Sequence, residues 1–262
     1  MQTKEVRCMG RDREIDGYLA LPEGDGLHPA IIVVHEIWGL DDHIRNVTRR
    51  FAEQGFVALA PDLYTGEWRE AMQPQRIMAG MQFLRQAPPE IQRDPSRLED
   101  ALQEFPPAER TALRTLMRVM RPEQRSAFAE DLLGALQFLQ QTPGVDPARI
   151  ACLGFCMGGG ITGQVATKAQ DLWRAVIFYG ENPPLEAVPK IRAEVLGLYG
   201  GEDPRITDTV PQLAKAMAEA GKEFTYRVFP GAPHAFFNDS REATYRPLAA
   251  ADAWAQVLSF LD

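Results

Sequence analysis

The sequence predicts an α/β fold in which a mostly parallel sheet of about eight strands carries helices on both faces. Two observations lead to this fold class. Apolar segments of strand length recur along the 262 residues, and most are apolar almost throughout, which is typical of strands covered on both faces. Segments with helical periodicity lie between them, and alternation of strands with helices indicates a parallel sheet with crossover helices.

The expected elements follow from this alternation. The clearest strand candidates are six apolar segments, at 30–34, 56–60, 149–153, 175–179, 194–199 and 224–229. Two weaker segments, near 5–8 and 17–21, are expected to form an antiparallel hairpin at one edge of the sheet. Helices are expected over 43–54, 122–141, 157–169, 208–220 and 244–261. Because no internal repeat or low-complexity linker interrupts the pattern, we expect residues 1–262 to form a single domain.

The segment from about 69 to 125 departs from the pattern, since it has helical periodicity and several prolines but no strand. We expect a helical insertion or lid. One helix is predicted to carry an apolar face and, along one flank, a row of arginines at 110, 114, 118, 121 and 125. A solvated charged face is the simpler interpretation of these arginines. The alternative is a lid whose arginines face an anionic ligand.

Charge and cysteine content restrict the class of protein. The chain has 28 basic and 36 acidic residues, a formal charge of −8, which argues against nucleic-acid binding. Three cysteines make no disulfide framework and suit a reducing compartment. The first residues are dense in charge, and no apolar run is long enough for a membrane helix. We therefore expect a cytoplasmic protein without a nucleic-acid or membrane partner. The choice between monomer and homodimer stays open.

The strongest functional signal is the segment Gly154-Phe155-Cys156-Met157-Gly158, which lies between a predicted strand and a predicted helix. It matches the nucleophile-elbow pattern G-x-S-x-G, with cysteine in place of serine. Glycines are needed on both sides because the sharp turn strains the backbone and brings neighbouring chain close. A thiol at a helix N-terminus is also activated by the free amides there. The simpler interpretation is a buried structural cysteine in a glycine-rich turn.

The partners of a cysteine nucleophile follow in the order that this architecture requires, each after a later strand. Gly201-Glu202-Asp203-Pro204 comes after the strand at 194–199, and His234 comes after the strand at 224–229. His234 is the only one of four histidines that follows the elbow. Asp203 is favoured as the acid because it lies furthest into its loop, although the sequence leaves Glu202 open.

The loop after the strand at 30–34 is the place for a second oxyanion amide in α/β hydrolases. The backbone N–H of Ile37 is the candidate there, and that of Met157 is its counterpart at the elbow. Glu36 is unexpected, because it sets a carboxylate where negative charge has to be stabilised. It is either an exposed loop acid or a group that governs the protonation of Cys156.

Five segments together resemble the dienelactone hydrolase family of α/β hydrolases: 35–39 (HEIWG), 60–64 (APDLY), 154–159 (GFCMGG), 200–203 (GGED) and 231–236 (GAPHAF). The resemblance implies a Cys156–His234–Asp203 triad in which Glu36 takes the thiol proton when substrate binds. It implies cleavage of a small-molecule ester or lactone through a thioester, with no cofactor or metal. A redox-active thiol paired with Cys152, or a non-catalytic receptor on the same scaffold, are the alternatives.

Two departures from the family concern its two arginines that hold a substrate carboxylate. One of them lies four residues after the histidine, where this chain has Asn238. Arg241 is near in sequence but not equivalent. The other falls in the long insertion, where Arg69, Arg76 and Arg85 are the candidates. Trp38, Asn238 and Arg85 are taken as candidate substrate contacts, and the physiological substrate stays open.

Overall fold

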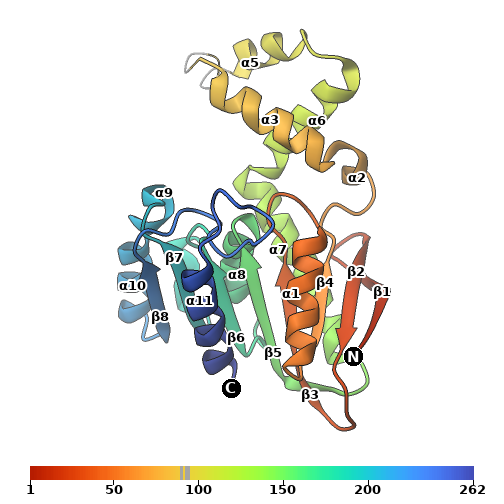
Figure 1. Cartoon of the computed structure of the whole chain (residues 1–262), viewed down its shortest axis with the longest axis vertical. Helices are drawn as coiled ribbons and strands as arrows, with labels where there is room; N and C mark the ends of the chain where they lie inside the picture. Colours follow the sequence, from red (N-terminus) through yellow and green to blue (C-terminus); the bar gives the residue numbers. More distant parts are fainter. Residues whose placement is uncertain (89–90, 92–94) are drawn as a thin grey trace.

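The computed structural model describes residues 1–88, 91 and 95–262 and contains one eight-stranded sheet, in the order β1-β2-β4-β3-β5-β6-β7-β8 (Figure 1). The strands from β4 to β8 in this order are parallel, whereas β2 runs antiparallel to both β4 and β1. The fold class and the edge hairpin predicted from the sequence are confirmed. The strands are β1 (Gln2–Met9), β2 (Glu14–Leu21), β3 (His28–Val34), β4 (Val57–Pro61), β5 (Val145–Phe155), β6 (Arg174–Phe178), β7 (Glu194–Gly200) and β8 (Phe224–Phe229).

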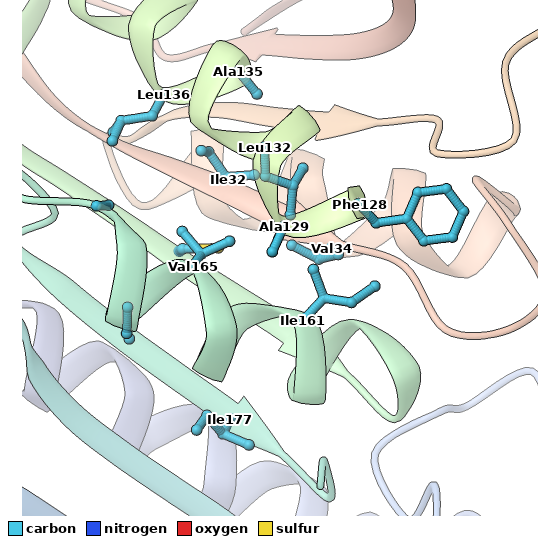
Figure 2. Close-up of a cluster of buried hydrophobic side chains, with 14 of the residues drawn as sticks. Ile32, Val34, Phe128, Ala129, Leu132, Ala135, Leu136, Ile161, Val165 and Ile177 are labelled. Atoms are coloured by element: carbon cyan, nitrogen blue, oxygen red, sulfur yellow. The ribbon is translucent and has the colours of Figure 1, made fainter. Parts of the chain in front are cut away.

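Helices cover both faces of the sheet. On one face α1 (Asp42–Glu53) and α11 (Pro247–Leu261) belong to the buried cluster that contains Ile31 and Val33 of β3. On the other face α7 (Pro122–Gln140), α8 (Met157–Lys168) and α10 (Val210–Glu219) belong to the cluster that contains Ile32 and Val34. Figure 2 shows this second cluster, where side chains of α7 and α8 lie against β3. The continuous apolar runs of the central strands are therefore required by burial on both faces.

The segment between β4 and α7 is helical and extends beyond the carboxyl end of the sheet (Figure 1). Trp68 packs edge-on against Phe128 of α7, with ring centroids 5.7 Å apart, and so connects the segment to the helix that covers the sheet. Leu113 and Leu116 are buried against Gly80, so part of the predicted apolar face is packed within the segment. Its helices are α2 (Trp68–Ala71), α3 (Pro74–Gln86), α5 (Pro95–Leu102) and α6 (Pro107–Val119).

The prediction of one helix carrying the whole arginine row is wrong. The row is divided between α6 and α7, because Pro122 has no N–H to continue a helix and instead begins a new one. Arg114 pairs with Glu99, and Arg118 lies over the ring of Trp68. Arg125, in the first turn of α7, points instead to Glu181 after β6. The arginines therefore have separate partners rather than one shared face.

Two shorter helices complete the described part of the chain: η1 (Leu185–Lys190) after β6 and α9 (Pro204–Thr207) after β7. Among the described residues, no helix has the length and apolar character to cross a membrane.

Candidate active site

Cys156 lies at the turn between β5 and α8, with φ 54° and ψ −115°, and is partly exposed. Such a positive φ is unfavourable for a residue other than glycine, and strain of this kind concentrates at functional sites. The flanking glycines permit the turn. A Cβ at Gly154 would lie 2.1 Å from the carbonyl oxygen of Gly158, and one at Gly158 would lie 2.5 Å from that of Val34. The strand–turn–helix arrangement of the elbow is therefore present.

Asp203 and His234 are brought together by the loops after β7 and β8. Their side chains join through Asp203 Oδ2 and His234 Nδ1, 2.5 Å apart. The backbone ties the loops together, because the N–H of Gly201 donates to Phe229 O at 2.9 Å and that of Glu202 to Ala232 O at 2.9 Å. Asp203 is buried, whereas Glu202 is exposed. The open choice between the two acids therefore falls to Asp203 on geometry.

The environment of His234 favours its charged form. Burial lowers the pKa of His234, but its hydrogen bonds to Asp203 and Cys156, and the negative charges of these groups, raise it overall to about 10. These contacts therefore favour the imidazolium form of His234, most strongly when Cys156 is a thiolate. A histidine in this state can donate a proton to a leaving group, but it cannot first accept one from a thiol.

Glu36 is not an exposed loop acid, since it is 2% exposed and lies in the wall of the same cavity as Cys156. Asn238 Nδ2 donates to Glu36 Oε2 at 2.7 Å, while Oε1 is buried without a hydrogen-bond partner. Burial raises the pKa of the Glu36 carboxyl, and the Asn238 hydrogen bond opposes this only in part. Glu36 is therefore a carboxyl held in a low-dielectric environment in the wall of this cavity.

Asn238 is fully buried, and its Oδ1 accepts hydrogen bonds from the N–H and hydroxyl of Ser240 at 3.0 and 2.6 Å. It is not among the residues that line the described cavity, and its side chain contacts Glu36 instead. The polar contacts of Asn238 fix the glutamate, which the sequence position alone did not indicate.

The residues of the two predicted oxyanion amides, Ile37 and Met157, line the same cavity as Cys156. Within the described ranges, neither the N–H of Ile37 nor that of Met157 donates to a protein acceptor. Tyr64, which the sequence analysis did not single out as functional, holds this arrangement, because its hydroxyl donates to Ile37 O at 2.9 Å and contacts Met157 Sδ at 3.7 Å. His35 Nδ1 lies 2.6 Å from Glu36 O and fixes the same loop.

A cavity of about 520 Å³ opens in front of Cys156 and His234. The predicted contacts Trp38 and Arg85 both line it. Arg241 stacks on the ring of Trp38, 3.7 Å from the centroid, with its Nε buried and without a hydrogen-bond partner. By contrast, Arg69 and Arg76 pair with acids, through Asp16 and Glu70 respectively. Other lining residues are Met81, Met120, Arg125, Met157, Tyr179, Glu181, Arg205 and Ile206.

Three of the cavity arginines were not among the candidate substrate contacts, although Arg125 belongs to the predicted arginine row. Arg125 comes from α7, Arg205 from α9 and Arg241 from the loop before α11. Glu181 accepts from both Arg125 and Arg205, the latter at 3.2 Å, so it neutralises only part of their charge. The residues are too far apart in sequence for a local pattern to group them. The arginine row of the insertion, interpreted as facing an anionic ligand, was the one available signal, and it included Arg125.

Cys152 has a different environment from Cys156. It is fully buried in β5, with its Sγ 3.5 Å from the hydroxyl of Thr162. Burial raises the pKa of the Cys152 thiol to about 12. Because the thiolate is the reactive form in disulfide exchange, this environment disfavours Cys152 as a resolving partner.

An eight-stranded, mostly parallel sheet with a strand–turn–helix elbow, and with an acid and a histidine after later strands, defines an α/β hydrolase. The fold extends to distant proteins. The acylaminoacyl peptidase of Pyrococcus horikoshii aligns with a TM-score of 0.67 at 16% identity, over 99% of this chain and 41% of that one.

The chain belongs to the dienelactone hydrolase family, whose sequence model matches residues 15–262. A protein of Saccharolobus solfataricus named "Putative carboxymethylenebutenolidase" is 38% identical over 259 residues, 98% of this chain and 97% of that one. One of the same name from Methylorubrum extorquens is 32% identical, over 97% and 78% of the two chains. The crystal structure titled "Putative Dienelactone Hydrolase from Klebsiella pneumoniae" has a TM-score of 0.73 at 28% identity, covering 100% and 99%. The chain is thus a hydrolase by family.

Proposed function

We propose that this protein cleaves a small ester or lactone through a thioester on Cys156. The observation that carries the proposal is the arrangement around one cavity: Cys156 at the strained elbow, His234 bonded to Asp203 at 2.5 Å, and a buried glutamate, Glu36, in the same wall. A nucleophile, an oriented histidine and a separate proton acceptor are the groups that acyl transfer requires.

Acylation begins with the thiol proton. Glu36, a buried carboxyl with a raised pKa in the same wall, accepts this proton, because the hydrogen bond and charge of Asp203 hold His234 as an imidazolium, which the forming thiolate stabilises further. The S–H bond of Cys156 breaks and an O–H bond forms on Glu36. The thiolate attacks the carbonyl carbon, a C–S bond forms, and the C–O bond of the ester breaks. His234 donates its proton to the departing alkoxide.

Deacylation uses the histidine that acylation left neutral. His234 accepts a proton from a water molecule, whose oxygen attacks the thioester carbon. The C–S bond breaks, the acid is released, and the thiolate regains the proton from Glu36. Asp203 fixes the tautomer of His234 and stabilises the imidazolium. In both steps the amides of Ile37 and Met157 would hold the oxyanion, a contribution of about 3–4 kcal/mol for one such donor.

The cavity wall supports a substrate that carries a negative charge. Four arginines, at positions 85, 125, 205 and 241, line the cavity against two glutamates, and Glu36 has a raised pKa because it is buried. Arg241 is the strongest candidate contact, because Trp38 supports it from one side and its Nε has no partner. We propose Trp38, Arg85 and Arg241 as substrate contacts, and Asn238 as a support for Glu36.

The helices at 68–119 would serve as a lid on a single hydrolase domain, since Met81 and Arg85 of α3 reach the cavity wall. A lid of this kind excludes water from the thioester and limits the size of the substrate.

The nucleophile is tested with a short aryl ester. Cys156→Ala should abolish hydrolysis and the acyl adduct that mass spectrometry detects on the wild-type protein, and leave the melting temperature nearly unchanged. Cys152→Ala is the matched control, because it removes the cysteine within β5. This variant should keep its activity. Full turnover by Cys156→Ala, or an adduct elsewhere in the chain, would contradict the assignment.

The substrate class is tested by comparing kcat/KM for neutral short-chain esters, anionic lactones and thioesters. We expect the anionic lactone to be preferred. Equal values for neutral and anionic substrates would show that the arginines serve the fold and not the substrate.

A further inference from the structure

A buried hydroxyl lies beside the reacting groups with no described partner. Tyr179 directly follows β6, is fully buried and has φ 37°, in the region that side chains other than glycine rarely adopt. Its ring packs edge-on against His234, with centroids 5.1 Å apart, and it lines the cavity together with Glu36 and Cys156. The strained backbone therefore directs a polar side chain into the site.

Two buried polar atoms in this wall lack a hydrogen bond: the hydroxyl of Tyr179 and Oε1 of Glu36. Buried polar groups are nearly always paired, so each exception needs an explanation. The two atoms are complementary. Burial raises the pKa of Tyr179 well above its ordinary value, and the charges of Glu36 and Cys156, together with the nearness of Glu36 as a hydrogen-bond acceptor, raise it further, so the phenol keeps its proton. Glu36 Oε1, when ionised, can only accept.

We propose that Tyr179 is a positioning residue whose hydroxyl donates a hydrogen bond to Glu36 Oε1 and keeps that carboxylate ionised and directed at the Cys156 thiol. Asn238 already holds Oε2 at 2.7 Å, so a second donor completes the support of both oxygens. Tyr179 keeps its own proton throughout, and the only proton that moves is the one from Cys156 to Glu36. The inference rests on the proposed function, because it assigns a support to the proton acceptor of that reaction.

The other ionisable groups around Glu36 do not replace this donor. His43, on α1, is held by Asp239 through Nδ1 at 2.8 Å, and its charge favours an ionised Glu36, as does that of His234. Asp41, just before α1, disfavours it. None of the three makes a described hydrogen bond to Oε1.

The chain contains a matched control in Tyr199, on the adjacent strand β7. Tyr199 is also fully buried with an unpartnered hydroxyl, but burial alone raises its pKa, with no part played by Glu36 or Cys156. Tyr199→Phe removes a hydroxyl without a described partner and should leave the melting temperature nearly unchanged, whereas Tyr179→Phe leaves a buried Glu36 oxygen without its donor and should lower the melting temperature.

The experiment is the pH profile of kcat/KM for a neutral aryl ester. A hydrogen-bond donor to an ionised carboxylate lowers the pKa of that carboxylate, so Tyr179→Phe should raise the pKa of Glu36. The acid limb should therefore move to higher pH by about one unit, and kcat/KM at a pH below the limb should fall about tenfold. Tyr199→Phe should leave the limb in place. In the Glu36→Gln background, Tyr179→Phe should have no further effect.

An unmoved acid limb in Tyr179→Phe, or an equal loss of rate in the Glu36→Gln background, would overturn the inference. The proposed function would survive either result, provided that the acyl adduct on Cys156 still forms. Loss of that adduct in the wild-type protein would instead contradict the proposed function itself.

Discussion

The end of the sheet and the helical segment above it contribute to one cavity in different ways. Glu36, Cys156, Asp203 and His234 all follow strands of the sheet, and the backbone around them is tightly packed. The helical segment over 68–119 and the residue that follows it supply Met81, Arg85 and Met120 to the cavity wall. In this segment the close neighbours of Gly80 are side-chain atoms, whereas those of Gly158 are backbone atoms. The comparison indicates that the closely packed strand ends hold the reacting groups in place. The side chains of the helical segment would contact the substrate and can be replaced with less disturbance of the fold.

The largest expected effect is on the sheet side. His234→Ala should lower kcat/KM for an aryl ester by about a thousandfold or more, because both proton transfers to and from substrate are lost. Steady-state kinetics on the purified variant measures this, with the melting temperature as a check on folding. Activity within tenfold of the wild type would separate His234 from the chemistry.

A glycine-to-alanine substitution is expected to lower the free energy of unfolding by different amounts at the elbow and in the helical segment. At Gly158 an added methyl meets backbone oxygens at 2.5 Å, so Gly158→Ala should cost about 2–3 kcal/mol or more. At Gly80 the added methyl lies 2.7 Å from Leu116 Cδ2, the far end of a flexible side chain that can move. Alanine also has a higher helix propensity than glycine. Gly80→Ala should therefore lie within about 1 kcal/mol of the wild type. Urea denaturation measures both, and equal losses would contradict the comparison.

A smaller effect is expected from the arginine wall. Arg241→Ala should raise KM for an anionic ester about tenfold, about 1.4 kcal/mol, and leave a neutral ester of the same size nearly unchanged. Arg192→Ala, at an exposed position outside the cavity wall, is the control. A parallel change for both esters would indicate lost packing on Trp38 instead of lost charge.

The smallest effect concerns the stability of the fold as a function of pH. Burial holds the pKa of Glu36 above that of an unfolded glutamate, so wild-type stability falls as pH rises from the ordinary glutamate value through the raised one. Glu36→Gln cannot ionise. The variant should therefore match the wild type at low pH and exceed it in melting temperature at higher pH. A constant difference across the pH range would show that Glu36 is not held in this way.

Much of the fold could be predicted from the sequence, because strands that are buried on both faces have continuous apolar runs. All eight strands lie where apolar runs or the weaker edge segments placed them, within a few residues. The helices within 107–140 were harder to predict, because apolar periodicity continues across Pro122, where α6 has ended and α7 begins. Local sequence also gave the order of Cys156, Asp203 and His234, because strand order sets which loops meet at the carboxyl end of the sheet.

The sequence by itself determined the elbow, the loops that carry the acid and the histidine, and the two-faced sheet, because each depends on local backbone geometry or on periodic burial. Only the tertiary structure decided that Asn238 supports Glu36, that Tyr179 and Glu36 each bury an unpaired polar atom, and that four arginines share one cavity. Those relations join segments up to about two hundred residues apart. These relations depend on the distance between the side chains in space and on their burial, and a local pattern of residues predicts neither.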